Sequence, residues 1–267
     1  MPDKPTTNSW LFPPTTQEVQ LDEKWSFVTK KQRHCQPGEE RCGDCWDHVA
    51  LDAESRLVLS VVIGKRTQAN AYQLVHELRE RTDGRPLNLI TTDEYPAYAS
   101  ALAAVYAEPA PAGQAVPESQ RLPEWLVYAT VHKTRENHRV LKVEARLVYG
   151  TLVSLAAALL WAVLGTISTV FIERANGTDR GRNSRKVRKT YRFSKDWEVH
   201  RAMTAFTLYS ANYCWPVRTL REEIAPKRYR QRTAAMAAGL TDHVWPLKEW
   251  LLFPSTSRYR LSPFRRQ

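Results

Sequence analysis

Cysteine is scarce in this chain. Four cysteines among 267 residues are too few for a scaffold held together by disulfides. The first sixteen residues contain proline, threonine and tryptophan but lack a basic start followed by an apolar run, so they do not have the pattern of a signal peptide. No internal repeat divides the chain. These features favour a reducing, intracellular environment, and we predict a cytoplasmic protein.

Acidic residues are outnumbered. Lysine and arginine total 39 against 28 aspartates and glutamates, which gives a net charge of +11. Solubility needs only a modest net charge of either sign, whereas a positive excess suits a polyanionic partner, above all nucleic acid. The alternative is a basic protein without such a partner. The apolar share of 43% is that of a globular protein, and the length suffices for one large domain or two small ones.

Charged residues are absent from residues 147–172. By length and hydropathy this stretch is a candidate transmembrane helix. Its most apolar part, residues 152–164, is shorter than a bilayer span, and glycine, serine and threonine interrupt the remainder. We therefore expect a buried core strand and helix here, and no membrane association.

Hydrophobic periodicity predicts alternating strands and helices after an irregular arm, residues 1–18, that is rich in proline and threonine. A helix is expected from Thr67, the predicted N-cap, to Arg81. In order, we expect a strand at 19–28, a polar loop at 30–47, a hairpin of 48–51 and 57–63, the helix at 67–81, a strand at 87–90 leading to Asp93, a helix at 98–106, a loop at 107–124, strands at 126–131 and 140–148, a helix at 194–213 and a basic tail.

Three carboxylates occupy suggestive places in this order. Asp22 lies on the first strand, Asp93 follows the fourth, and Glu173 opens a later helix. In a β-β-β-α-β unit the first and fourth strands can be neighbours, so their carboxylates can face one metal ion. Hard divalent cations such as Mg²⁺ prefer oxygen ligands of this kind. The alternative is that these acids are turn formers or helix caps, since Asp93 precedes Tyr95 and Pro96.

Five short segments, in order, resemble the motifs of the IS-one family of bacterial insertion-sequence transposases. The first three contain the carboxylates, the fourth is basic, and the fifth closes the likeness, which covers about residues 20–222. They are LDEKWSFV at 21–28, TTDEYPAY at 91–98, FIERAN at 171–176, RKTYRFSK at 188–195 and NYCWPVR at 212–218.

The resemblance implies an α/β fold: a ribonuclease H-like mixed sheet flanked by helices, with an extra β-hairpin insertion. It implies a catalytic domain at 19–222, between the arm at 1–18 and a basic tail at 223–267. It further implies that Asp22, Asp93 and Glu173 hold Mg²⁺ or Mn²⁺, as two ions, for cleavage and strand transfer of DNA. Double-stranded DNA, both element ends and target, is the partner implied.

Basic residues follow Glu173 directly: eight lysines and arginines against one acid between Arg174 and Arg192. A carboxylate cluster that acts on DNA needs nearby cations to offset repulsion of the phosphates, although the alternative is a solvated face. The predicted DNA contacts are Arg174, Arg180, Arg182, Arg185, Lys186, Arg188, Lys189 and Lys195.

Some expected features are missing. Ala175 stands where many relatives have histidine, and no zinc ribbon or helix-turn-helix precedes Val19. We therefore expect a separate upstream protein to recognise the element ends, with an inactive remnant that only binds DNA as the alternative. Strand transfer joins two ends, which predicts a homo-oligomer on DNA. Cys42 and Cys45 crowd into one loop with Cys35, so we expect loop cysteines rather than a zinc site.

Overall fold

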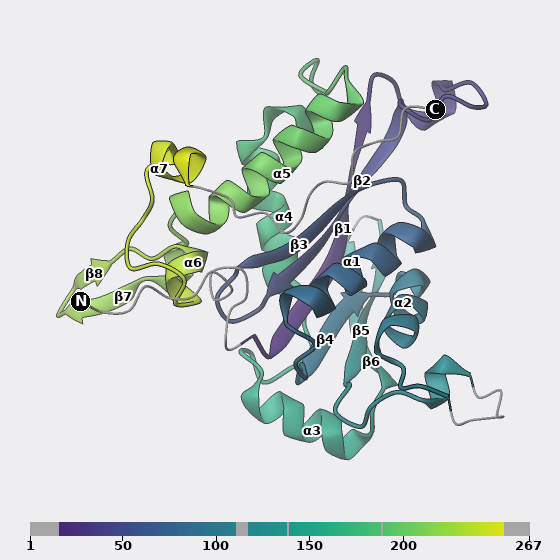
Figure 1. Ribbon diagram of the computed structural model, residues 1–267, viewed down its shortest axis with the longest axis vertical. Helices are drawn as coiled ribbons and strands as arrows, with labels where there is room; N and C mark the ends of the chain where they lie inside the picture. The colour runs from purple at the N-terminus through teal and green to yellow at the C-terminus, as the bar shows by residue number, and fades with distance from the viewer. Residues whose placement is uncertain (1–15, 111–116, 138, 188, 254–267) are drawn as a thin grey trace.

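Strand β1 (Glu18–Val28) lies at the centre of a six-stranded mixed sheet with the order β3-β2-β1-β4-β5-β6 (Figure 1). The structure is a computed structural model that describes residues 16–110, 117–137, 139–187 and 189–253. The other strands are β2 (Gly43–Asp52), β3 (Val58–Gly64), β4 (Leu89–Asp93), β5 (Tyr128–Glu136) and β6 (Arg139–Tyr149), with a separate hairpin of β7 (Glu222–Ala225) and β8 (Arg228–Arg230).

The first three strands form an antiparallel meander, and β4 returns parallel to β1. Strand β5 is parallel to β4, and β6 runs antiparallel at the edge of the sheet. The predicted adjacency of the first and fourth strands is therefore confirmed, as is the mixed α/β class. The hairpin of β5 and β6 extends the sheet beyond β4.

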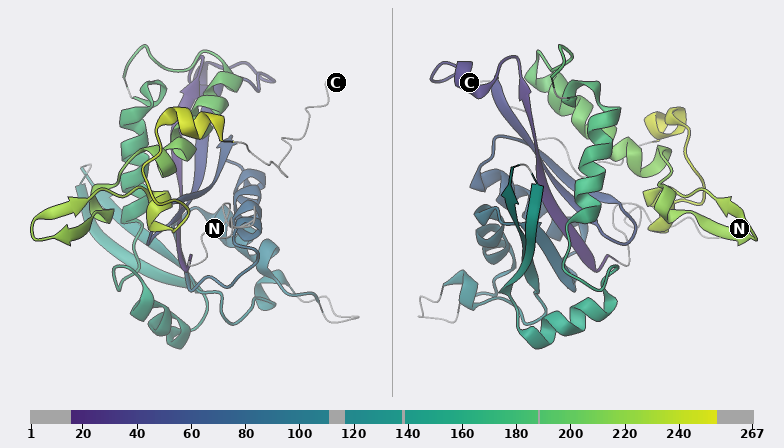
Figure 2. Two further views of the ribbon diagram at one scale, coloured as in Figure 1. Left: turned by 60° about the vertical axis from the view of Figure 1, so that its left-hand side comes forward. Right: turned by 180° about the vertical axis from the view of Figure 1, so that it is seen from behind.

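Helices cover both faces of the sheet (Figures 1 and 2). Helices α1 and α2 pack on one face around Leu21, Leu74 and Leu102, and helices α4 and α5 lie on the other, where Ile172 and Leu208 are buried. The helices are α1 (Gln68–Arg81), α2 (Pro96–Tyr106), α3 (Leu152–Trp161), α4 (Val170–Arg182), α5 (Trp197–Cys214), α6 (Ala234–Ala237) and α7 (Leu247–Leu252).

Local signals placed helix α1 correctly. The Thr67 hydroxyl accepts a hydrogen bond from the Asn70 amide, which is the predicted N-cap interaction. Strand β2, in contrast, begins at Gly43, so the predicted loop at 30–47 is too long. The prediction failed at Asp47, because a carboxylate is typical of a loop and unusual inside a strand. Only its buried cationic partners explain its place in β2.

The charge-free segment 147–172 is not the buried unit that was expected. It contains the end of β6, helix α3 and the start of α4. Ala158 is buried, but Leu160 is 83% and Trp161 78% exposed. Among the described residues, no helix is both long enough and apolar enough to span a bilayer.

Part of the predicted basic tail packs on the body of the fold. Ala234, Ala235, Ala238 and Leu240 join the core cluster that lies under α1 and α2. The division into 1–18, 19–222 and 223–267 stays a prediction, although residues up to 240 contribute to the same core as residue 19. Residues 1–15 of the predicted arm and the residues after 253 lie outside the described residues.

Candidate active site

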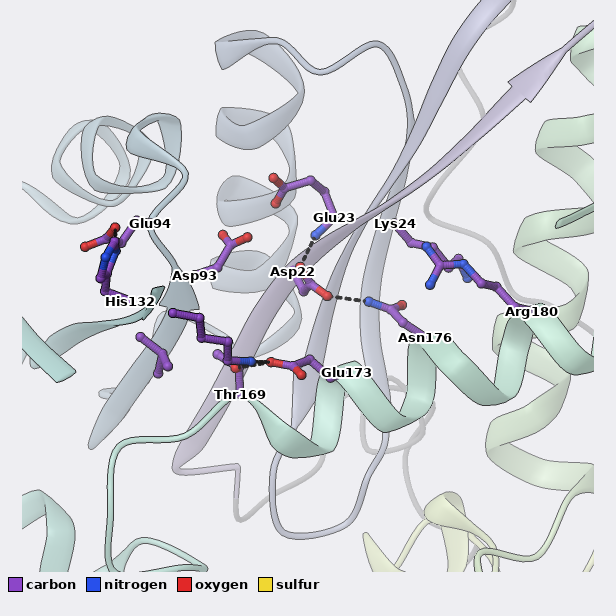
Figure 3. Close-up of a pocket in the computed structure, with 12 residues that line it drawn as sticks. Asp22, Glu23, Lys24, Asp93, Glu94, His132, Thr169, Glu173, Asn176 and Arg180 are labelled. Carbon is purple, nitrogen blue, oxygen red and sulfur yellow. Dashed lines mark hydrogen bonds and ion pairs between the residues drawn. The ribbon is translucent and has the colours of Figure 1, made fainter. Parts of the chain in front are cut away.

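A cleft of about 590 Å³ opens where β1 and β4 run side by side (Figure 3). Leu21 of β1 is in register with Thr92 of β4, so the next residues, Asp22 and Asp93, become neighbours. Helix α4 forms another wall and contributes Glu173. All three predicted carboxylates therefore line one cleft, although they come from distant parts of the chain.

Glu23 is a fourth carboxylate of this cleft, and the sequence reasoning missed it. Side-chain oxygens of Asp22, Glu23 and Asp93 lie within 4.8 Å of one another. Strand alternation directs consecutive side chains to opposite faces, which is why Glu23 was not expected beside Asp22. Arg66 holds it there, since its Nε donates to Glu23 Oε1 at 2.8 Å.

The close carboxylates resist ionisation. Burial raises the pKa of Asp22 to about 6, and the negative charge of Asp93 adds to this shift. Burial likewise raises the pKa of Glu23 to about 7, with Asp93 again adding and Arg66 opposing. Burial also raises the pKa of Asp93. Such a group of oxygens gains most from a divalent cation, which offsets the mutual repulsion.

Glu173 lies on the opposite wall, outside the group of three close carboxylates. Its Oε1 accepts a hydrogen bond from Thr169 Oγ1 at 2.6 Å and forms an ion pair with Lys133 of β5. One turn further along α4, Asn176 Nδ2 donates to Asp22 Oδ2 at 2.8 Å. Helix α4 thus orients Asp22 through Asn176. This residue is buried, and the sequence did not predict a role for it.

Gln20 determines where α4 begins. Its Oε1 accepts hydrogen bonds from the backbone amides of Phe171 at 3.1 Å and Ile172 at 3.0 Å. The first amides of a helix have no partner within the helix, and here a buried side chain from β1 supplies one. Because Gln20 is two residues before Asp22, the same face of β1 positions both the helix and the carboxylate it approaches.

Replacing Gln20 by alanine should lower the free energy of unfolding by about 2 kcal/mol, since two buried amides lose their acceptor. Urea denaturation measures this. Gln17→Ala is the matched control, because Gln17 is exposed just before β1 and its side chain bonds only the Asn88 side chain in the described structure. Equal stability of the two variants would contradict the capping role.

The predicted DNA contacts separate into groups. Arg180 lines the carboxylate cleft. Arg174 and Arg182 instead line a second hollow of about 500 Å³ on another face of α4. Lys189 and Lys195 are exposed. Arg185 is partly buried, and Arg188 lies outside the described residues.

Lys186 is a correction to the predicted set. It is buried, and its ammonium forms an ion pair with the equally buried Asp47. Asp47 also lies 3.3 Å from Lys24 Nζ, and Lys24 pairs with Asp179 of α4. Lys186 therefore stabilises the packing of α4 on the sheet, and its charge is not available to a phosphate.

His200 lies beside this buried network. Its Nδ1 is 2.8 Å from Ser194 Oγ, and its Nε2 is 3.2 Å from Ser26 Oγ. Burial lowers the pKa of His200 to about 4, and the positive charge of Lys186 adds to the shift. The imidazole is consequently neutral at physiological pH, and the network of two lysines and two aspartates is balanced in charge.

The loop cysteines fall into two groups. Cys35 and Cys42 lie 2.9 Å apart at Sγ, near Glu39. Cys45 is instead buried near Asp47 and His200. Cys42 and Cys45, the pair noted in the sequence, therefore face different surroundings.

Comparison with known proteins gives little. No family model matches the chain, and no curated protein matches it. A solved structure with some similarity is a crystal structure of the Mos1 strand transfer complex, with 19% sequence identity and a TM-score of 0.22. The similarity covers 31% of this chain and 29% of that one, so the chain spans under a third of the protein it matches. A likeness of this extent does not define the fold.

Proposed function

We propose that the protein is a DNA transposase of the Asp-Asp-Glu type, with a ribonuclease H-like core. The observation that carries this proposal is the meeting of carboxylates from β1, β4 and α4 in one cleft. The sheet order, with three antiparallel strands followed by parallel strands beside β1, is compatible with such a core. The five motifs that resemble the IS-one family include these same acids.

The donor set suits a hard divalent cation. Asp22, Glu23 and Asp93 offer only oxygen atoms, with Glu173 on the facing wall. Bound there, Mg²⁺ or Mn²⁺ would activate water or a 3′ hydroxyl and stabilise the leaving oxygen. In this proposal Asp22, Asp93 and Glu173 are the metal ligands. Asn176 orients Asp22, and Lys133 holds Glu173 until a cation competes for it.

Metal binding is expected to depend on pH. The raised pKa values mean that protons occupy these carboxylates below about pH 6 to 7. The folded protein binds these protons more tightly than the unfolded chain does, so the metal-free protein loses stability as pH rises from about 4 to 7. Mg²⁺ or Mn²⁺ at about 100 times its Kd should raise Tm by roughly 5 to 10 °C at pH 8, and by much less at pH 5. Thermal unfolding measures both, and an equal shift in Asp22→Asn would contradict the site.

DNA binding is expected to use the exposed cations of the basic segment that follows α4. Each phosphate contact contributes about 0.9 to the slope of log K against log salt concentration. Lys195→Ala should therefore weaken binding and reduce that slope by about one. Lys248→Ala, at an exposed lysine on α7, is the matched control. An unchanged slope in the Lys195 variant would remove Lys195 from the proposed interface.

The alternative is a remnant that binds DNA without cutting it. The presence of every carboxylate in one cleft favours the active enzyme. The test is strand cleavage of DNA taken from both sides of this reading frame, with Mg²⁺ or Mn²⁺ and with chelator. Any upstream protein that recognises element ends should be added and omitted, since end recognition is proposed to reside there. Binding without cleavage under all these conditions would support the remnant.

A further inference from the structure

The outer edge of β6 is unusual for a sheet edge. Within the described part of the chain, β6 pairs with β5 alone, so its other side presents unpaired backbone groups. Eight of the eleven residues of this strand are exposed. Leu141 is 62% and Val143 59% exposed, although both are apolar. Long edges with exposed apolar residues tend to pair with another strand.

Charge on β6 indicates what that other strand is. Lys142 Nζ and Glu144 Oε1 are 2.8 Å apart, so these two side chains share a face of the strand, with Val143 between them on the other. If two copies of β6 run antiparallel with Val143 opposite itself, Lys142 lies opposite Glu144 of the partner subunit. The two-fold axis then generates the same ion pair twice.

Neighbouring registers lack this complementarity. Centring the pair on Lys142 would oppose two lysines, and centring it on Glu144 would oppose two glutamates. A shift of one residue would place Lys142 and Glu144 opposite apolar side chains. Centring the pair on Ala145 would set Glu144 opposite Arg146 of the partner subunit, but Arg146 already forms an ion pair with Glu94, and Lys142 would lie opposite a valine. The register through Val143 gives both Lys142 and Glu144 an opposite charge and, on the other face, places Leu141 opposite Ala145 of the partner subunit.

We propose that β6 is a self-association surface through which two copies of this chain join their sheets edge to edge. A two-fold pairing of one edge with itself closes the assembly and protects both edges. The inference deepens the oligomer expected under the proposed function but is tested without DNA. Its failure would therefore leave the proposed catalytic site untouched.

Charge exchange tests the surface. Sedimentation of the full chain over a range of concentrations should show a species of twice the 30.7 kDa chain mass. Lys142→Glu and Glu144→Lys should each weaken the dimer by about tenfold or more, because two attractive pairs become repulsive. The double exchange should restore it. A wild-type chain that stays monomeric, or a double exchange no better than the single variants, would overturn the proposal.

Thiol cross-linking tests the register. In the Val143→Cys variant, two introduced thiols face each other, and oxidised glutathione should convert them to one disulfide while it is reduced to two thiols. Lys142→Cys is the matched control, since its partner position is Glu144, and wild type accounts for the native cysteines. Equal cross-linking of both variants would overturn this register. If Lys142→Glu instead weakens only DNA binding, the hairpin contacts DNA and the dimer surface is wrong.

Discussion

Replacement of Asp93 by asparagine is expected to slow DNA strand cleavage by about a thousandfold or more. A metal ion that acts as a Lewis acid contributes several kcal/mol to stabilisation of the transition state, and each 1.4 kcal/mol is about tenfold in rate. Asparagine keeps the size of the side chain but removes the negative charge that holds the cation. The folded protein should be at least as stable as wild type without metal, because Asp93 raises the pKa of both Asp22 and Glu23 by repulsion.

The measurement is single-turnover cleavage with Mn²⁺ and with Mg²⁺. Asp83→Asn is the matched control, since Asp83 is exposed in a turn with φ of 54°, a conformation that asparagine tolerates. It should cleave at the wild-type rate. Cleavage that survives in the Asp93 variant would rule out the mechanism proposed above, whereas cleavage lost in both variants would point to a folding defect.

Replacement of Lys186 by methionine is expected to lower the free energy of unfolding by about 3 to 5 kcal/mol. Methionine fills a similar volume, so the loss is mainly the cost of leaving Asp47 with less compensation. Burial alone would raise the pKa of Asp47, but Lys186 and Lys24 hold it below its ordinary value. Without Lys186, the Asp47 carboxylate would form an ion pair with Lys24 alone, and Lys24 also pairs with Asp179.

Urea denaturation at pH 7 measures the loss. Lys189→Met is the matched control, because Lys189 is three residues away, exposed, and a proposed DNA contact. The Lys186 variant should unfold at a lower urea concentration than wild type. The Lys189 variant should be as stable as wild type but bind DNA with a smaller salt dependence. A stable Lys186 variant with weakened DNA binding would return Lys186 to the DNA-contacting set.

The sequence predicted the order of strands and helices well because the apolar periods are strong and the turns are local. It predicted the pairing of β1 with β4 for the same reason, since few topologies accommodate such an order. Thr67 is an example of a signal that needs no tertiary information, because its partner is three residues away. Strand order and the resemblance of the motifs together predicted Asp22 and Asp93 as neighbouring carboxylates.

What the sequence did not predict depends on contacts between distant residues. No local sequence pattern predicts the roles of Glu23, Asn176 and Gln20. Each contacts a segment more than forty residues away. In the sequence Lys186 resembles its basic neighbours. Its burial depends on the ion pair with Asp47, which is distant in the sequence. The exposed surface of α3 was also missed, because an apolar helix is expected to be covered.

The even spacing along β1 has one more consequence. Gln20, Asp22, Lys24 and Ser26 are spaced two residues apart and reach, in turn, the start of α4, the cleft, Asp179 and His200. Loss or gain of a single residue within this stretch would turn all later members to the opposite side of the sheet. A substitution here removes one of these contacts, whereas a one-residue change in length displaces several of them together. An in-frame insertion or deletion of one codon in the part of the gene that encodes β1 is therefore expected to disrupt both the folding of the protein and its cleft.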